Sequence, residues 1–98
     1  MTAYLVVDVE WHDSAKANEY VAKFGPVLEK YGGRFVGGGQ PQLLEGNWEP
    51  RRVYIFDFPT MEALRRWYDS EEYAPLHRIR VEGARTNIIA VEGPPAGR

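Results

Sequence analysis

The segments 3–9 and 52–58 are both expected to form β-strands, because they are rich in Val, Ile, Leu, Tyr and Phe. Each segment is mostly apolar on both of its faces: in 52–58, for example, Ile55 belongs to one face and Phe56 to the other. A strand with two apolar faces needs a packed layer on each side, so neither segment suits a sheet that turns one face to water. This requirement constrains the fold of the 98-residue chain more than any other sequence feature.

A long amphipathic helix is expected over residues 14–31, with Asp13 or Ser14 as its N-cap. Apolar side chains recur there at steps of three and four residues, which places them on one helical face. Pro26, preceded by a glycine, interrupts the pattern. Because proline has no N–H and crowds the preceding turn, we expect a kink or a break at that point. Gly32 can adopt the positive φ that ends a helix.

Residues 34–36 are predicted to begin a second strand, which continues at 43–45 after three glycines that suit a bulge or a loose strand. Thr60 is suited to cap a helix over 61–69, whose buried side includes Trp67. The remaining expected elements are a helix from Pro75 to about Val81 and a last strand over 86–91.

The expected order of elements is β-α-β-β-α-β, which predicts an α+β domain over residues 1–93 followed by a flexible tail, 94–98. This order is typical of the ferredoxin-like fold, a four-stranded antiparallel sheet with its helices on one face. The other face of such a sheet is open, yet the strands are apolar on that side as well. We therefore expect a homodimer in which two copies pack through their open sheet faces.

Composition excludes several classes of protein and leaves a globular one. Hydrophobic residues make up 44% of the chain and the formal net charge is −2, so we expect neither disorder nor binding to nucleic acid. No apolar run reaches the length of a membrane span, and the first residues lack the pattern of a signal peptide. Without cysteine there are no disulfides or thiolate ligands. We expect a cytoplasmic protein without membrane contact.

No motif for a metal, flavin or nucleotide is found, so we expect no cofactor. The glycines 37–39 are not followed by the helix and the Lys-Ser/Thr pair that a phosphate-binding loop requires. The two histidines, His12 and His77, lie far apart in the sequence and without the spacing of a metal site, which favours structural or surface roles.

Asp8 is a candidate general base. It is a carboxylate on a mostly apolar strand, and burial there would raise its pKa into a range useful for proton transfer. The alternative is that Asp8 lies at the end of the strand or pairs with an arginine.

A second group of candidates lies near the last helix. Tyr73, His77 and Arg80 are spaced i, i+4 and i+7, which places them on one helical face, and Tyr68 can join them. Arginine can hold a carboxylate or enolate through paired hydrogen bonds, and histidine can transfer a proton. The same spacing also fits a helix that packs Tyr73 on the sheet and leaves His77 and Arg80 in water.

Several segments together resemble the DUF1330 family. They are, in order, 31–35 (YGGRF), 44–48 (LEGNW), 58–63 (FPTMEA), 67–73 (WYDSEEY) and 91–93 (VEG). The resemblance extends over residues 3–93 and implies a dimeric α+β barrel, similar in architecture to cofactor-free monooxygenases of the antibiotic-biosynthesis type. It also implies a role for Arg80, because the family pattern has an arginine about two helical turns after the tyrosine. Pro75 and His77 are less typical of that pattern.

These observations lead to three hypotheses. The first is a homodimer with a small-molecule pocket between sheet and helices, where Arg80 anchors an anionic or carbonyl-bearing ligand beside Tyr68 and Tyr73. In that case Asp8 or His77 would move a proton in a cofactor-free isomerisation or oxygenation. The second is a non-catalytic module that binds or senses a metabolite. The third is a purely structural dimer without a cavity.

Overall fold

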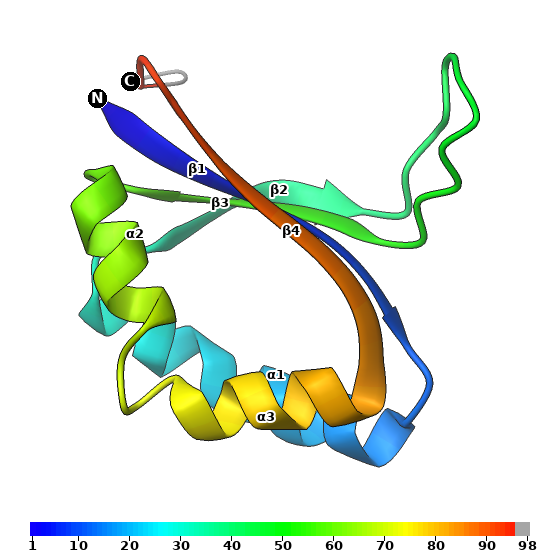
Figure 1. Cartoon of the computed structure of the whole chain (residues 1–98), viewed down its shortest axis with the longest axis horizontal. Helices are drawn as coiled ribbons and strands as arrows, with labels where there is room; N and C mark the ends of the chain where they lie inside the picture. The colour runs from blue at the N-terminus through cyan, green and yellow to red at the C-terminus, as the bar shows by residue number, and fades with distance from the viewer. Residues whose placement is uncertain (96–98) are drawn as a thin grey trace.

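The chain folds into a four-stranded antiparallel sheet with three helices on one face, which confirms the predicted α+β, ferredoxin-like architecture (Figure 1). This computed structural model describes residues 1–95. The strands lie in the order β2-β3-β1-β4. The elements are β1 (Thr2–Trp11), α1 (Ser14–Lys30), β2 (Arg34–Gly39), β3 (Val53–Phe58), α2 (Met61–Tyr68), α3 (Ala74–Gly83) and β4 (Ala84–Gly93).

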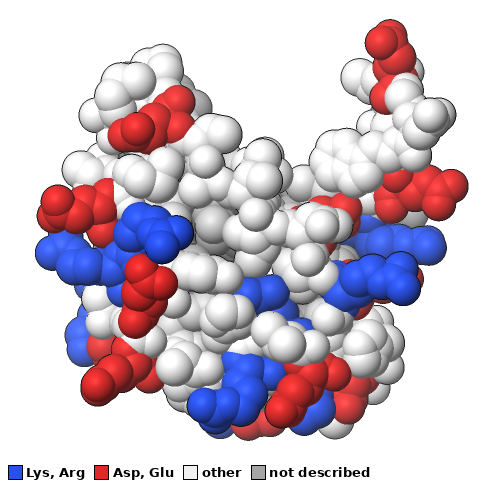
Figure 2. Space-filling view, viewed as in Figure 1, with Lys and Arg blue, Asp and Glu red and all other residues white. Residues whose placement is uncertain are grey.

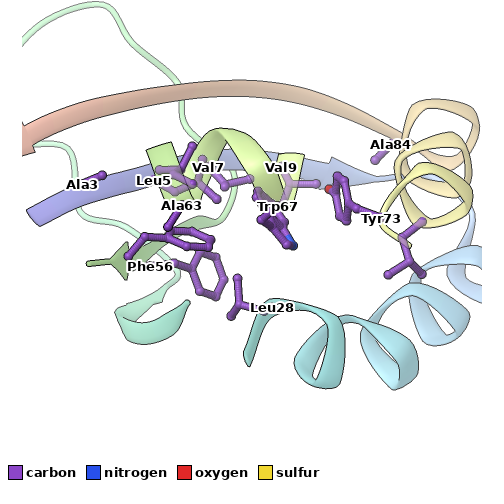
Figure 3. Packing of buried hydrophobic residues seen from close by; sticks show 13 residues of the cluster. Ala3, Leu5, Val7, Val9, Leu28, Phe56, Ala63, Trp67, Tyr73 and Ala84 are labelled. Atoms are coloured by element: carbon purple, nitrogen blue, oxygen red, sulfur yellow. The ribbon is translucent and has the colours of Figure 1, made fainter. Parts of the chain in front are cut away.

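The core lies between the sheet and the helices. Every second residue of β1 from Ala3 to Val9 faces the helices and is buried, and Leu5 pairs with Phe56 of β3 across the sheet. Trp67 of α2 and Tyr73 are the two largest side chains buried almost completely. Figure 3 shows both of them beneath the sheet, on the side of α1. These two aromatic rings join α2 and α3 to the sheet.

The predicted helix caps are present. Asp13 accepts a hydrogen bond from the backbone N–H of Lys16, and Thr60 accepts one from that of Ala63. Gly32 has a φ of +87°, a conformation that glycine adopts without a steric penalty. The expected break at Pro26 does not occur, because α1 continues through this residue to Lys30.

The second strand differs from the prediction. β2 runs directly through the three glycines to Gly39, with a shift in register between Phe35 and Gly37. A Cβ atom on Gly38 would collide with the carbonyl of Val53, so close pairing with β3 requires glycine there. The prediction that residues 43–45 continue the strand was wrong, since they lie in the long loop between β2 and β3. Gly46 and neighbouring polar residues favour a loop over a strand.

The open face of the sheet is apolar at its centre. Val6 of β1 lies between Ile55 of β3 and Ile89 of β4, and the side chain of Ile89 is 60% exposed. The loop between β2 and β3 rises on this same side of the sheet (Figure 1). In Figure 2, uncharged residues form the hollow between this loop and the chain ends, whereas charges of both signs surround the helical half.

The predicted tail, 94–98, lies partly outside the described residues. Within them, the hydroxyl of Tyr4 donates a hydrogen bond of 2.6 Å to the carbonyl of Pro94. No helix in the described range is long and apolar enough to cross a membrane.

Candidate functional site

A cavity of about 990 Å³ lies between α1 and the helix-facing side of the sheet. Its walls are mainly apolar and include Leu5, Val7 and Val9 of β1. From α1 the lining includes Ala17, Ala22 and Gly25, whose small side chains leave room in front of the sheet. Within α1, which the structure describes completely, Leu28 alone is buried. The side of α1 that faces the sheet is therefore only partly packed against it.

Arg80, in the last turn of α3, lines this cavity although its side chain is only 5% exposed. Its Nε donates a hydrogen bond of 3.3 Å to the hydroxyl oxygen of Tyr73. No Asp or Glu among residues 1–95 lies within ion-pair distance of Arg80. A buried cation without an acidic partner is costly, so an anion bound in the cavity would gain a strong, little-hydrated partner.

The hydroxyls of Tyr20 and Tyr73 lie 2.7 Å apart beside this guanidinium. One phenolic proton is used in the bond between the two oxygens, and the Nε of Arg80 supplies its own proton to Tyr73. The second phenolic proton has no acceptor in the described part of the chain. The pair can therefore donate one hydrogen bond to a ligand.

The local electrostatics keep these groups in defined protonation states. Burial raises the pKa of Tyr20 far above its ordinary value, and the neighbouring Tyr73 raises it further, so Tyr20 stays a neutral donor. Burial alone would lower the pKa of Arg80, but interactions with Tyr73, Tyr20 and Tyr68 outweigh this effect and raise it. Arg80 therefore stays a cation.

The structure separates the candidates predicted around the last helix. Tyr73 and Arg80 line the cavity, whereas Tyr68 and His77 do not. The rings of Tyr68 and His77 lie 5.2 Å apart, and the His77 ring stacks on Tyr73 at 5.8 Å. Burial and the charge of Arg80 lower the pKa of His77, so its neutral form predominates at neutral pH.

Asp8 lies on the open face of the sheet, opposite the cavity. Its carboxylate accepts hydrogen bonds from the indole N–H of Trp48 at 3.1 Å and from the backbone N–H of Arg51 at 2.9 Å. These contacts tie the loop between β2 and β3 to the sheet. In the structure Asp8 therefore anchors a loop. Its role in proton transfer stays a prediction.

Tyr20 and Trp67 are among the cavity residues that were not predicted as site residues from the sequence. The sequence places Tyr20 on the apolar face of α1 and Trp67 on the buried side of α2, and both line the cavity. The Nε1 of Trp67 is buried and has no hydrogen-bond partner among the described residues. Helical spacing does not separate a residue that packs in the core from one that lines a cavity in it. The aromatic content of both positions was the one available signal.

Comparison with known families gives one match. Residues 2–94 match the model of a domain of unknown function, DUF1330. No match was found among curated proteins.

Solved structures share the fold at low sequence identity. RPA0582, a protein of unknown function from Rhodopseudomonas palustris, has a TM-score of 0.78 and 19% identity, over 96% of this chain and 83% of that one. A dimeric ferredoxin-like protein of unknown function from Jannaschia sp. CCS1 has a TM-score of 0.72 and 14% identity, over 95% and 100%. SnoaB, a cofactor-independent oxygenase from Streptomyces nogalater, has a TM-score of 0.69 and 15% identity, over 98% and 96%.

Proposed function

Because this chain belongs to the DUF1330 family, whose function is unknown, we propose a function from the chain's own cavity. The protein is a homodimer that binds one small, anionic or carbonyl-bearing organic molecule in the cavity of each protomer. Arg80 anchors the negatively charged or carbonyl end of this molecule, and the hydroxyl pair of Tyr20 and Tyr73 supplies a further hydrogen bond.

One observation carries this proposal: a guanidinium that is 5% exposed faces a mostly apolar cavity without an acidic partner. A guanidinium that served only the fold would be expected to have a carboxylate beside it, because burial of an unpaired charge destabilises a protein. A purely structural dimer would require solid packing between the sheet and α1. The cavity beside Arg80 therefore supports ligand binding over that alternative.

The homodimer follows from the open sheet face. Val6, Ile55 and Ile89 form an apolar surface there, and burying it against a second copy would remove it from water. The fold shared with a dimeric protein from Jannaschia agrees with this assembly. In such a dimer the cavity of each protomer stays on the helical side and is accessible.

A second candidate function is cofactor-free proton transfer on the bound molecule. It is favoured by the phenolic hydrogen-bond donor of the Tyr20 and Tyr73 pair and the neighbouring guanidinium, which together can stabilise an enolate oxygen. The proton that leaves the substrate carbon would pass to solvent. The fold of SnoaB, a cofactor-independent oxygenase, is compatible with chemistry of this class. Binding does not depend on such a step, so binding is the first property to test.

Native mass spectrometry of freshly purified protein, with and without denaturation, is the direct test. We expect a mass of two chains plus a small molecule that is lost on denaturation. The matched variants are Gly25→Trp and Gly25→Ala. Gly25 lines the cavity, and apart from its chain neighbours a Cβ atom there would meet nothing within 4 Å, so a tryptophan side chain can extend into the space. Because Pro26 follows, both variants share the cost of a Cβ atom before proline, and Gly25→Ala controls for it.

We expect Gly25→Trp to abolish the small-molecule adduct and Gly25→Ala to keep it. An adduct that persists in Gly25→Trp lies elsewhere, which would contradict the proposed cavity. A protein that never carries an adduct, and that binds no member of a library of organic acids, would contradict the binding function itself.

A further inference from the structure

We propose that the cavity takes a flat aromatic carboxylate, whose oxygens accept hydrogen bonds from the guanidinium of Arg80 and the indole N–H of Trp67. This inference rests on the proposed binding function and specifies the class of ligand. It assigns a binding role to Trp67, which also belongs to the hydrophobic core.

The shape and chemistry of the walls favour an aromatic ligand. Seven of the lining residues are aromatic side chains in mutual contact: Trp11, Tyr20, Phe24, Phe35, Phe56, Trp67 and Tyr73. Rings in proteins prefer offset and edge-to-face contacts, and several pairs in this wall already have them. The ring planes of Phe24 and Trp67, for example, are inclined by 86°. A flat ring can extend this arrangement, and a volume of about 990 Å³ is ample for a fused ring system.

The charge of the inner wall favours an anion. Among the charged residues that line the cavity, Arg80 is buried. The one acidic residue in the lining, Glu29, is exposed on α1. A planar carboxylate matches the planar guanidinium and can accept two parallel hydrogen bonds from it.

The second donor is the Nε1 of Trp67. An N–H buried without an acceptor destabilises a protein, and no residue within the described range accepts from this atom. In Figure 3 the nitrogen lies on the side of the ring turned away from the sheet, between Leu28 and Tyr73 in that view. Both of these neighbours line the cavity. Trp67 is 1% exposed, so the bond requires that a flanking side chain moves when the ligand binds.

The two donors lie within the reach of one ligand because both contact Tyr73. The Nε of Arg80 bonds to the hydroxyl of Tyr73 at 3.3 Å, and the ring centre of Trp67 is 4.3 Å from that of Tyr73. A single tyrosine side chain therefore bridges the donors. In the proposed pose the carboxyl group lies against Tyr73 and accepts from Arg80 through one oxygen and from Trp67 through the other.

Two nearly isosteric probes test this inference by calorimetry: 2-naphthoate, which is an anion, and 2-naphthamide, which is neutral and keeps the carbonyl acceptor. We expect the wild type to bind 2-naphthoate at least tenfold more tightly. Arg80→Met keeps the aliphatic stem and should remove this preference, with little change for 2-naphthamide. Trp67→Phe keeps a ring but loses the N–H, and should weaken both probes about fivefold, since both have an acceptor oxygen.

The outcomes separate this inference from the function on which it rests. Equal affinity of the wild type for both probes would overturn the carboxylate class and leave the cavity as a binding site. Unchanged affinities in Trp67→Phe would overturn the role of its N–H. Binding of neither probe would overturn the aromatic class, while an adduct seen by native mass spectrometry would still support the cavity.

A measurement on the wild type keeps the test independent of how well Trp67→Phe folds. The indole ¹H–¹⁵N signal of Trp67 should move to lower field when 2-naphthoate is added, because a new hydrogen bond deshields the proton. The signal of Trp48, which does not line the cavity and bonds to Asp8 on the other face of the sheet, serves as the reference in the same spectrum. A Trp67 signal that stays in place at saturation would contradict the proposed contact.

Discussion

The hydroxyl oxygens of Tyr20 and Tyr73 lie 2.7 Å apart and join the middle of α1 to the start of α3. Arg80 donates to the same Tyr73 oxygen, so residues from two distant segments of the chain meet in the cavity wall. Because both tyrosines are held in place by packing, the guanidinium is fixed before a ligand arrives. Such preorganisation lowers the entropic cost of binding.

The stability of the protein should depend on Tyr20 at high pH. The folded state raises the pKa of Tyr20 above the ordinary value of 10.0, mainly through burial. Above pH 10 the unfolded chain therefore releases this proton while the folded protein keeps it. The free energy of unfolding should fall by about 1.4 kcal/mol per pH unit on account of Tyr20. Urea unfolding of wild type and Tyr20→Phe should show this difference in slope.

Below pH 9 the two proteins should have the same slope, because Tyr20 is then protonated in both states. A Tyr20→Phe variant that matches the wild-type slope above pH 10 as well would show that this phenol titrates normally in the folded protein.

Arg80→Met should raise the pKa of His77. Burial lowers that pKa first, and the positive charge of Arg80 lowers it further, so removal of the charge leaves burial alone. An NMR titration of the imidazole signals measures the change, with the exposed His12 as the reference. The variant should also lose less stability than the wild type as the pH falls below about 6.5, because folding then opposes protonation of His77 less strongly. An unchanged His77 titration would contradict the coupling.

Asp8→Asn should loosen the loop between β2 and β3 and leave the cavity intact. The substitution weakens the charge-assisted bonds to the indole of Trp48 and the backbone of Arg51. Amide hydrogen exchange in residues 40–52 should become faster, while affinity for a cavity ligand should stay within about twofold because the two sites lie on opposite faces of the sheet. A tenfold loss of ligand affinity would place Asp8 in the binding site after all.

Ile89→Lys should convert the proposed dimer to a monomer. Ile89 lies beside Val6 on the apolar part of the open sheet face, where a lysine in each copy would bury two like charges against an apolar surface. Light scattering after size-exclusion chromatography gives the mass. The matched control is Val81→Lys on α3, whose wild-type side chain has nearly the same exposure, 62% against 60%. We expect the control to stay dimeric; dissociation of both variants would contradict the assignment of the interface to the sheet.

Much of the fold was predictable because its signals are local. Asp13 and Thr60 cap helices through side-chain oxygens that bond within three residues, and Gly32 ends a helix through its own backbone freedom. The two-sided apolar pattern of β1 likewise indicated a covered strand. The prediction of a strand at 43–45 was wrong. Two adjacent apolar residues form a strand only where a partner strand lies beside them, and the sequence does not show that partner.

The candidate site was predictable only in part. Arg80 and Tyr73 were identified by helical spacing, and both line the cavity. The same spacing included His77, but its ring stacks on Tyr73 and does not line the cavity. Tyr20 is 53 positions away from Tyr73 and Trp67 looks like an ordinary core residue, so neither could be assigned to the site from the sequence.

The sequence by itself determined the order of the elements, the caps that bound the helices and the family, since each depends on residues close together in the chain. Tertiary structure alone decided which side of the sheet each candidate occupies. It separated Asp8 from Arg80, because alternate residues of a strand point to opposite faces. It also brought Tyr20 and Tyr73 beside one guanidinium and packed Trp67 on Tyr73, because the packing of helices on a sheet sets distances that sequence separation does not encode.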